Sequence, residues 1–331
     1  MKQPEDIPLT LITGFLGSGK TTIIKNLLKQ KELKNTAVII NEFGDIGLDN
    51  YFIETSNEDL VELSTGCLCC VMRGDLQEAI ARLLKKRLDG FLFDRIILET
   101  TGMADPAPII QSLLLDQTSS PKVILDRVLV TVDGMTGLNS LSEFEEASRQ
   151  VALADILLIT KTDLLSESTE GLKKGLRAIN NNAKIFTSNL GQIDLTLVLG
   201  KSDTWTNNYV SKAEDGHFHS HSNITSVSLH LKKPIHAVTL TLFLEVLAET
   251  LGSDLIRIKG LVFIKEAKET PAIVHGVQHV FHAISWHENW PENRQETQLV
   301  LIGRELSLQW VEALLVTIEE EVDEMTRHKS H

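Results

Sequence analysis

All three cysteines of this 331-residue chain lie within four residues, Cys67-Leu68-Cys69-Cys70. Thiolates prefer Zn²⁺, Cu(I) and other soft or borderline metal ions. Three thiolates leave one position of a tetrahedral site open, and an open position suits metal transfer better than a closed structural site does. The spacing therefore predicts a metal site made by Cys67, Cys69 and Cys70. Two alternatives stay open: Cys67 is a buried core thiol beside a two-cysteine site, or all three thiols are structural.

A glycine-rich run, Gly14-x-x-x-x-Gly19-Lys20-Thr21, follows a predicted strand and opens a predicted helix, which is the context that a phosphate-binding loop requires. Glycines let backbone N–H groups surround phosphate oxygens, and the helix N-terminus adds its positive dipole end. Lys20 is predicted to reach the β- and γ-phosphates, and the Thr21 hydroxyl to bind Mg²⁺. The residues assigned to the nucleotide in this loop are Gly14, Gly17, Ser18, Gly19, Lys20, Thr21 and Thr22.

A second apolar strand ends in a carboxylate at Leu98-Glu99-Thr100-Thr101-Gly102, with a glycine three residues after the acid. This spacing is typical of the Walker-B and switch II region of nucleotide hydrolases, in which the acid holds Mg²⁺ and the glycine N–H senses the γ-phosphate. Glu99 is one methylene longer than the usual aspartate, so we expect it to act on Mg²⁺ through water.

Thr160-Lys161-Thr162-Asp163 follows a later strand and is similar to the guanine-reading Asn-Lys-x-Asp signature, with threonine in place of asparagine. Asp163 would accept hydrogen bonds from guanine N1 and N2, which adenine cannot offer. The Lys161 stem would cover the base plane, and Ser188 is a weaker candidate for the other side of the base. The alternative is an ordinary surface turn.

Asn41-Glu42-Phe43-Gly44-Asp45 follows the second predicted strand, where P-loop GTPases have switch I. Glu42 and Asp45 are hard ligands that could serve Mg²⁺ or fill the open position of the cysteine site in one nucleotide state. The alternative is a pair of solvated loop acids. Lys20, Glu42 and Glu99 are the residues assigned to catalysis.

All eleven histidines lie at or beyond His217, and three of them alternate in His217-Phe-His219-Ser-His221. Alternate residues of an extended chain point to the same side, so these three imidazoles could share a metal ion. A solvated linker is the equally weighted alternative.

Short runs of Val, Ile and Leu alternate with helical stretches over the first 200 residues, which is typical of strands buried in a parallel sheet. The pattern predicts a doubly wound, mostly parallel α/β domain over 1–200. The expected strands are Leu9–Thr13, Ala37–Asn41, Arg95–Glu99, Val128–Asp133, Ile156–Thr160 and Lys184–Thr187, and the expected helices are Thr21–Gln30, Leu76–Leu88, Pro108–Leu115 and Glu143–Ala154.

A polar linker is predicted over 201–223, followed by a smaller α+β domain over 224–331. Its expected strands are Ile224–Leu231, Leu255–Ile264, Ala272–His275, Ala283–Trp286 and Gln298–Ile302, and its expected helices are Leu240–Leu251 and Leu308–Glu324.

The formal charge of −13 argues against nucleic acid or an anionic membrane as a partner, because both require a basic face. Three clustered cysteines do not make a disulfide framework, so reduced thiols are expected. The sequence has no signal-peptide pattern and no apolar run of the ~18–20 residues that span a membrane. These features predict a cytoplasmic protein.

The motifs together resemble the CobW-type P-loop GTPases, a family of metallochaperone-like proteins. The matching stretches are Gly14–Thr22, Asn41–Asp49, Gly66–Cys70, Glu99–Pro106 and Thr160–Leu164, and Arg257–Gly260 is similar to the family's C-terminal module. Two departures are Asp45, where many members have glutamate, and Ile40, where a subset has an additional glutamate.

The resemblance implies GTP hydrolysis with Mg²⁺, tight binding of Zn²⁺ or Co²⁺ (Ni²⁺ in the wider group of nickel chaperones) at the Cys-x-Cys-Cys element, and metal delivery to a client metalloprotein. It also implies a metal- or nucleotide-dependent homodimer. Intrinsic turnover is expected to be slow, because the sequence shows no convincing arginine finger in cis. The alternatives are a P-loop nucleotidase with a structural zinc, and a non-catalytic metal and GTP sensor that regulates a partner.

Overall fold

The structure is a computed structural model that describes residues 6–33, 35–41, 60–62, 68–72, 76–116, 121–165, 168–199, 223–291 and 294–328, and for 41, 60–62 and 68–72 it describes the backbone alone. The chain divides into two compact units. The first comprises Met1–Lys173 and Ala183–Ser202, and the second comprises Lys174–Asn182 and Asp203–His331. Each is considered by itself below.

The described part of the first unit contains an eight-stranded sheet in the order β3-β4-β2-β5-β1-β6-β7-β8. Its strands are β1 (Ile7–Gly14), β2 (Thr36–Asn41), β3 (Leu60–Glu62), β4 (Leu68–Met72), β5 (Arg95–Glu99), β6 (Val123–Asp133), β7 (Ile156–Thr160) and β8 (Lys184–Thr187). Every neighbouring pair is parallel except β3 with β4. The prediction of a doubly wound, mostly parallel sheet is confirmed.

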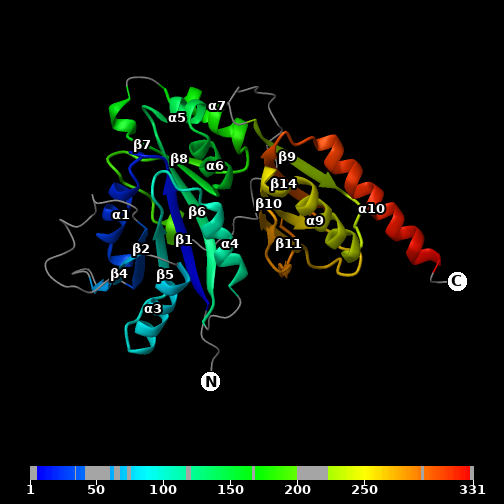
Figure 1. The fold of residues 1–331 in the computed structure, drawn as a ribbon, viewed down its shortest axis with the longest axis horizontal. Helices are drawn as coiled ribbons and strands as arrows, with labels where there is room; N and C mark the ends of the chain where they lie inside the picture. The colour runs from blue at the N-terminus through cyan, green and yellow to red at the C-terminus, as the bar shows by residue number, and fades with distance from the viewer. Residues whose placement is uncertain are drawn as a thin grey trace. The chain divides into compact units, whose positions relative to one another are not determined.

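Helices lie on both faces of this sheet, and Figure 1 shows α1 and α4 on opposite sides of it. The helices described in the first unit are α1 (Lys20–Leu28), α3 (Leu76–Leu88), α4 (Ala107–Leu115), α5 (Gly137–Glu143), α6 (Glu145–Leu153) and α8 (Thr196–Leu199). The residues of α7 (Glu170–Ile179) are divided between the first unit, up to Lys173, and the second, from Lys174. The apolar side chains of α1 and α8 pack against β1, β2 and β5 in one buried cluster that includes Ile12, Ile23 and Val38. This packing holds the loop between β1 and α1 at the carboxyl edge of the sheet, where α/β proteins bind ligands.

The structure differs from the sequence predictions at several elements of this unit. The helix predicted over 143–154 is observed as α6, and an additional helix, α5, precedes it, separated from it by Phe144, which is extended with φ −123°. β6 begins at Val123 rather than Val128. The cysteine segment contributes a short hairpin, β3 and β4, that was not predicted as strands.

The described part of the second unit has an antiparallel sheet in the order β12-β11-β10-β14-β9, with β13 paired to β11. The elements are β9 (Ile224–Leu231), α9 (Ala237–Leu251), β10 (Leu255–Val262), β11 (Ala272–Val277), β12 (Val280–Phe281), β13 (Ser285–Trp286), β14 (Thr297–Arg304) and α10 (Leu308–His328). α9 and α10 pack against the sheet through a core that includes Phe243, Ile258 and Leu315. The smaller α+β domain is therefore confirmed as a fold.

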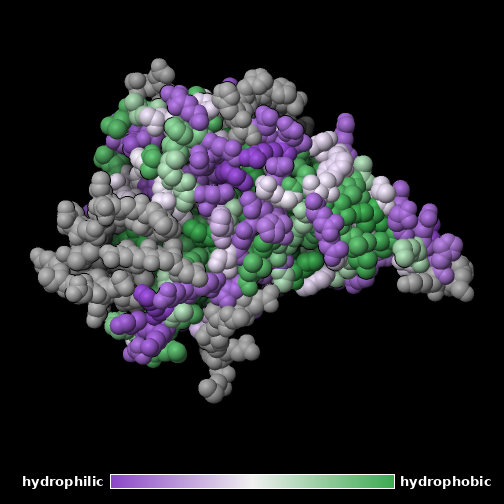
Figure 2. All heavy atoms as spheres, in the orientation of Figure 1, coloured by the Kyte–Doolittle hydropathy of each residue, from purple (hydrophilic) through white to green (hydrophobic). Residues whose placement is uncertain are grey.

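Both helices of this unit also carry exposed apolar side chains, including Val238, Leu242 and Val316. Figure 2 shows hydrophobic surface over the region of α9 and α10. None of the helices in the described ranges combines the length and hydropathy needed to cross a bilayer.

Candidate nucleotide and metal site

The loop between β1 and α1 has a backbone that requires glycine. Gly14, Gly17 and Gly19 have φ values of 145°, 70° and 91°, a region that side-chain-bearing residues rarely adopt. A Cβ on Gly14 would lie 2.3 Å from both the carbonyl oxygen and Oγ1 of Thr131. The glycine spacing is thus imposed by the conformation and by the close approach of β6.

Lys20 is buried in this loop, with a side-chain ammonium that points back into it. Its Nζ donates to the carbonyl oxygens of Gly14 and Phe15 at 2.7 and 3.2 Å. Burial lowers the pKa of Lys20, and the negative charge of Glu99 partly opposes that shift. A cation held inside a glycine loop at a helix N-terminus is suited to phosphate oxygens.

Thr21 and Glu99 meet at the carboxyl edge of the sheet. Thr21 Oγ1 donates to Glu99 Oε1 at 3.1 Å, and Glu99 is 4% exposed. β5 lies directly beside β1, with Glu99 opposite Ile12. A hydroxyl and a carboxylate are the hard oxygen ligands that Mg²⁺ prefers, so the pair predicted from sequence fits that ion.

The segment after Glu99 is packed against the phosphate loop. A Cβ on Gly102 would lie 2.8 Å from Leu16 Cδ2 and 2.9 Å from the Cα and N of Leu16. The side chain of Gln150, on α6 and 1% exposed, donates through Nε2 to the carbonyl oxygens of Gly102 and Ala104 at 3.2 and 3.0 Å. The segment is therefore held between the loop and α6.

Gln150 was missed in the sequence analysis. Its only sequence signal is a glutamine on the inward face of an amphipathic helix, next to the alanines and valine that α6 buries. A buried glutamine normally has hydrogen-bond partners. When those partners are far away in the sequence, the sequence pattern around the glutamine does not identify them.

Thr160, which replaces the asparagine of the guanine signature, has a defined role in the structure. Its Oγ1 donates to the carbonyl oxygen of Ser18 at 2.8 Å, which ties the end of β7 to the phosphate loop. Lys161 follows in the left-handed region, with φ 55°. The threonine therefore preserves a connection between the two motifs.

Lys161 is oriented by Asp133, a residue that the sequence analysis did not assign. Lys161 Nζ lies 2.6 Å from Asp133 Oδ2. Asp133 Oδ1 accepts the N–H groups of Met135 and Thr136 at 2.8 and 3.3 Å. Burial raises the pKa of Asp133, but the hydrogen bonds from Lys161 and these two N–H groups outweigh it and hold the pKa below its usual value. The carboxylate stays charged and fixes the lysine.

Asp163 and Ser188 lie close together at the ends of β7 and β8. Asp163 Oδ1 accepts the Leu190 N–H at 3.1 Å. The Thr162 hydroxyl donates to the Ser188 carbonyl oxygen at 2.9 Å, and the Ser188 hydroxyl donates to Gln192 O at 2.6 Å. Ser188 therefore holds the loop beside Asp163, and its hydroxyl is already engaged.

Several predicted metal ligands lie outside the described residues: Glu42, Asp45, Cys67, His217, His219 and His221. Cys69 and Cys70 belong to β4, whose backbone pairs with β2 at Val38 and Ile39. β2 pairs with β5, and β5 with β1. Four strands are therefore consecutive neighbours in the sheet. They are β4 with the two cysteines, β2 leading to Glu42, β5 ending at Glu99, and β1 leading into the phosphate loop.

Two family models match this chain. The CobW/HypB/UreG nucleotide-binding domain matches residues 8–187, and the cobalamin synthesis protein CobW C-terminal domain matches residues 224–319. The zinc chaperone YjiA of Escherichia coli is 33% identical over 304 residues, covering 91% of this chain and 95% of that protein. The zinc chaperone CobW of Pseudomonas aeruginosa is 28% identical over 352 residues, covering 92% and 90%.

A solved structure supports the same grouping. The crystal structure of zinc-bound YjiA GTPase from E. coli superposes with a TM-score of 0.77 at 30% identity, covering 95% of this chain and 99% of that chain. A likeness of this extent includes both units. The phosphate loop, the Thr21–Glu99 pair and the two matched domains together show that the chain belongs to the CobW family of GTPase metallochaperones.

Proposed function

We propose that this protein hydrolyses GTP slowly and uses its nucleotide state to control a thiolate metal site, which it unloads onto a client metalloprotein. The observation that carries the proposal is the strand order β4-β2-β5-β1. In this order the cysteine strand β4 pairs with β2, β2 pairs with the Glu99 strand β5, and β5 pairs with β1, which leads into the phosphate loop. A rearrangement at the γ-phosphate can thereby reach the thiolates through paired backbone.

In this proposal, side chains and glycines that the structure describes bind the phosphates of GTP. Lys20 neutralises the β- and γ-phosphates once its contacts with Gly14 O and Phe15 O are exchanged for phosphate oxygens. Thr21 and Glu99 would hold Mg²⁺, which supplies charge neutralisation on the phosphates when it is bound. Gly102, packed on Leu16, presents its N–H group to the γ-phosphate.

In this proposal, the residues that contact the nucleotide base select guanine. Asp163 exchanges the Leu190 N–H for guanine N1 and N2. The aliphatic stem of Lys161, held by Asp133, lies against the base. Because the required donors are absent from adenine, the proposal expects ATP to bind far more weakly than GTP.

Asp133→Asn is expected to lower GDP affinity about tenfold, which corresponds to ~1.4 kcal/mol. The amide keeps the size of the side chain but removes the charge that fixes Lys161 at 2.6 Å. Fluorescent GDP titration measures the effect. Asp94→Asn is the control, because Asp94 is exposed at the start of β5 and away from the base site. An unchanged affinity in Asp133→Asn would show that the Lys161–Asp133 pair has no part in base binding.

The proposal also assigns the transported metal ion, Zn²⁺ or Co²⁺, to the thiolates of Cys67, Cys69 and Cys70. Glu42 or Asp45 would be the fourth ligand in one nucleotide state. Release to the client follows when hydrolysis withdraws that ligand. A tenfold change in metal affinity needs only ~1.4 kcal/mol of differential interaction. Transfer to the client, homodimer formation and a cytoplasmic setting belong to the same proposal.

The test is the Zn²⁺ and Co²⁺ affinity of the wild type and of Cys69→Ser/Cys70→Ser, each with GDP and with a non-hydrolysable GTP analogue plus Mg²⁺. We expect the wild-type affinity to differ about tenfold or more between the two nucleotides. The double variant should lose both the tight site and the nucleotide dependence. Equal affinity in both nucleotide states would overturn the coupling and favour a GTPase with a structural zinc.

A further inference from the structure

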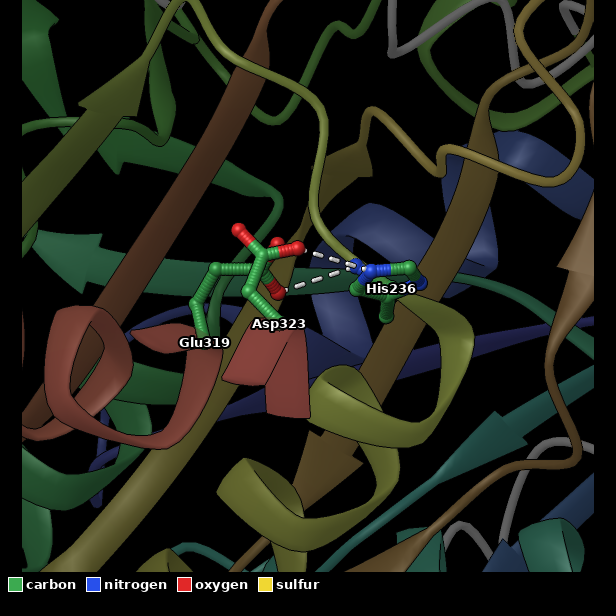
Figure 3. Close-up of side chains that lie close together, drawn as sticks. All are labelled: His236, Glu319 and Asp323. Carbon is green, nitrogen blue, oxygen red and sulfur yellow. Dashed lines mark hydrogen bonds and ion pairs between the residues drawn. The ribbon is translucent and has the colours of Figure 1, made fainter. Parts of the chain in front are cut away.

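A second group of metal-ligating side chains lies in the second unit, far along the sequence from the cysteines. It consists of His236, Glu319 and Asp323, and one ligand atom from each lies within 4.8 Å of the others. Figure 3 shows the two carboxylates of α10 pointing toward the imidazole, which comes from the residue just before α9. Glu319 and Asp323 are four residues apart, so they share one face of their helix.

The imidazole is held in place by a carboxylate behind it. His236 Nδ1 lies 2.8 Å from Glu266 Oε1, and His236 Nε2 lies 3.0 Å from Asp323 Oδ1. Metal-binding histidines are usually oriented in this way, by a carboxylate on the ring nitrogen that does not face the metal. Glu266 therefore leaves Nε2 as the atom directed at the α10 carboxylates.

The α10 carboxylates are fixed as well. Glu319 Oε2 accepts the His236 N–H at 3.0 Å and the Thr239 hydroxyl at 2.6 Å. Its other oxygen, Oε1, faces the centre of the group. The side chains of His236, Glu319 and Asp323 are 17%, 15% and 33% exposed, so the centre is partly shielded but can be reached from solvent.

The ammonium of Lys265 lies between the two carboxylates of α10. Lys265 Nζ lies 2.6 Å from Glu319 Oε1 and 2.6 Å from Asp323 Oδ1. Two carboxylates, those of Glu319 and Asp323, contact this one ammonium, so the lysine alone does not balance their charge. The Lys265 side chain is 27% exposed, so it already borders solvent.

We propose that His236 Nε2, Glu319 and Asp323 form a second metal site, for a divalent transition metal ion such as Zn²⁺ or Co²⁺, in which Lys265 holds the cation position until the metal displaces it. An imidazole nitrogen with two carboxylates is a donor set that suits Zn²⁺ and Co²⁺, while Mg²⁺ and Ca²⁺ prefer oxygen ligands alone. Three protein ligands leave a position for water or for an incoming ligand. The site uses none of the residues assigned to the cysteine cluster or to the nucleotide.

The test uses the full chain with the other candidate ligands removed. In this reference variant Cys67, Cys69 and Cys70 are replaced by serine, and His217, His219 and His221 by alanine. Zn²⁺ is titrated in competition with a chromogenic chelator. We expect one Zn²⁺ per chain, with an affinity that falls about tenfold or more on adding His236→Ala or Asp323→Asn. Lys265→Met should raise the affinity, because it removes the competing ammonium.

His282→Ala is the control, since His282 is an exposed histidine of this unit that lies outside the group, with its Nδ1 2.7 Å from the neighbouring Ala283 carbonyl oxygen. It should leave Zn²⁺ affinity unchanged. Circular dichroism of each variant checks the fold, and Asp323→Asn retains side-chain size if His236→Ala fails to fold. The proposal is overturned if the reference variant and its Lys265→Met form both bind no stoichiometric Zn²⁺, or if His236→Ala and Asp323→Asn bind it as the reference does.

Discussion

Gly102→Ala is expected to lower single-turnover GTP hydrolysis about a hundredfold or more while changing GDP affinity far less. The added Cβ would lie 2.9 Å from the backbone Cα and N of Leu16. Backbone atoms cannot shift as easily as the end of a flexible side chain can. The segment after Glu99 must therefore move away from the phosphate loop. In the proposed function, this displacement would take the Gly102 N–H away from the γ-phosphate, which GDP does not have.

Gly171→Ala is the matched control, because a Cβ at that position meets nothing within 4 Å. It should leave hydrolysis and GDP affinity at wild-type levels. Phosphate release in a single turnover and titration with fluorescent GDP separate the two effects. A Gly102→Ala protein that hydrolyses GTP at the wild-type rate would refute the role of this segment as γ-phosphate sensor.

Lys20→Met should reduce GTP hydrolysis about 10²–10³-fold, the cost of removing one preorganised charge donor from a transition state. The nucleotide-free protein should stay folded, because the substitution removes a cation whose burial already lowers its pKa. Multiple-turnover phosphate release measures the loss, and the thermal unfolding midpoint without nucleotide measures the fold.

Lys25→Met provides the comparison for this variant, because Lys25 lies in the last turn of the same helix. The two variants lose the same charge from α1, and only one of them faces the loop. Equal hydrolysis rates in Lys20→Met and Lys25→Met would be incompatible with the proposed phosphate contact.

The elements that the sequence predicted best are those with a strong local pattern. β5 and β7 were predicted with their observed bounds, because each is a run of buried aliphatic residues that ends in a polar one. The glycines of the phosphate loop were also identifiable, since their spacing reflects a backbone that residues with side chains rarely adopt.

Elements determined by distant packing were not predicted. Helix α5 and the extended Phe144 that follows it were not predicted. The Phe144 ring lies against Phe15, with centroids 4.7 Å apart, a contact that a helical periodicity cannot reveal. β3 has three residues and pairs with β4, too short for a pattern to emerge.

The same holds for the candidate site: residues in local motifs were predicted from the sequence, and residues that act through distant partners were not. Lys20, Thr21 and Glu99 were assigned from motifs, and the structure brings the last two together at 3.1 Å. Asp133 and Gln150 were not assigned, because their partners Lys161 and Gly102 lie 28 and 48 residues away. His236 and Asp323 are separated by 87 residues, so their meeting depends on how α10 packs against the sheet.

The order of the strands also has a kinetic consequence. β1, which leads into the phosphate loop, lies deep inside the sheet, whereas β4 is separated from the edge only by the short β3. Amide hydrogens of inner strands exchange through global unfolding, but those near an edge exchange through cheaper local opening. Fraying of β3 and β4 therefore leaves β2, β5 and β1 paired. In the proposed function, the cysteine strand could therefore be remodelled during metal exchange while an intact sheet still holds the nucleotide.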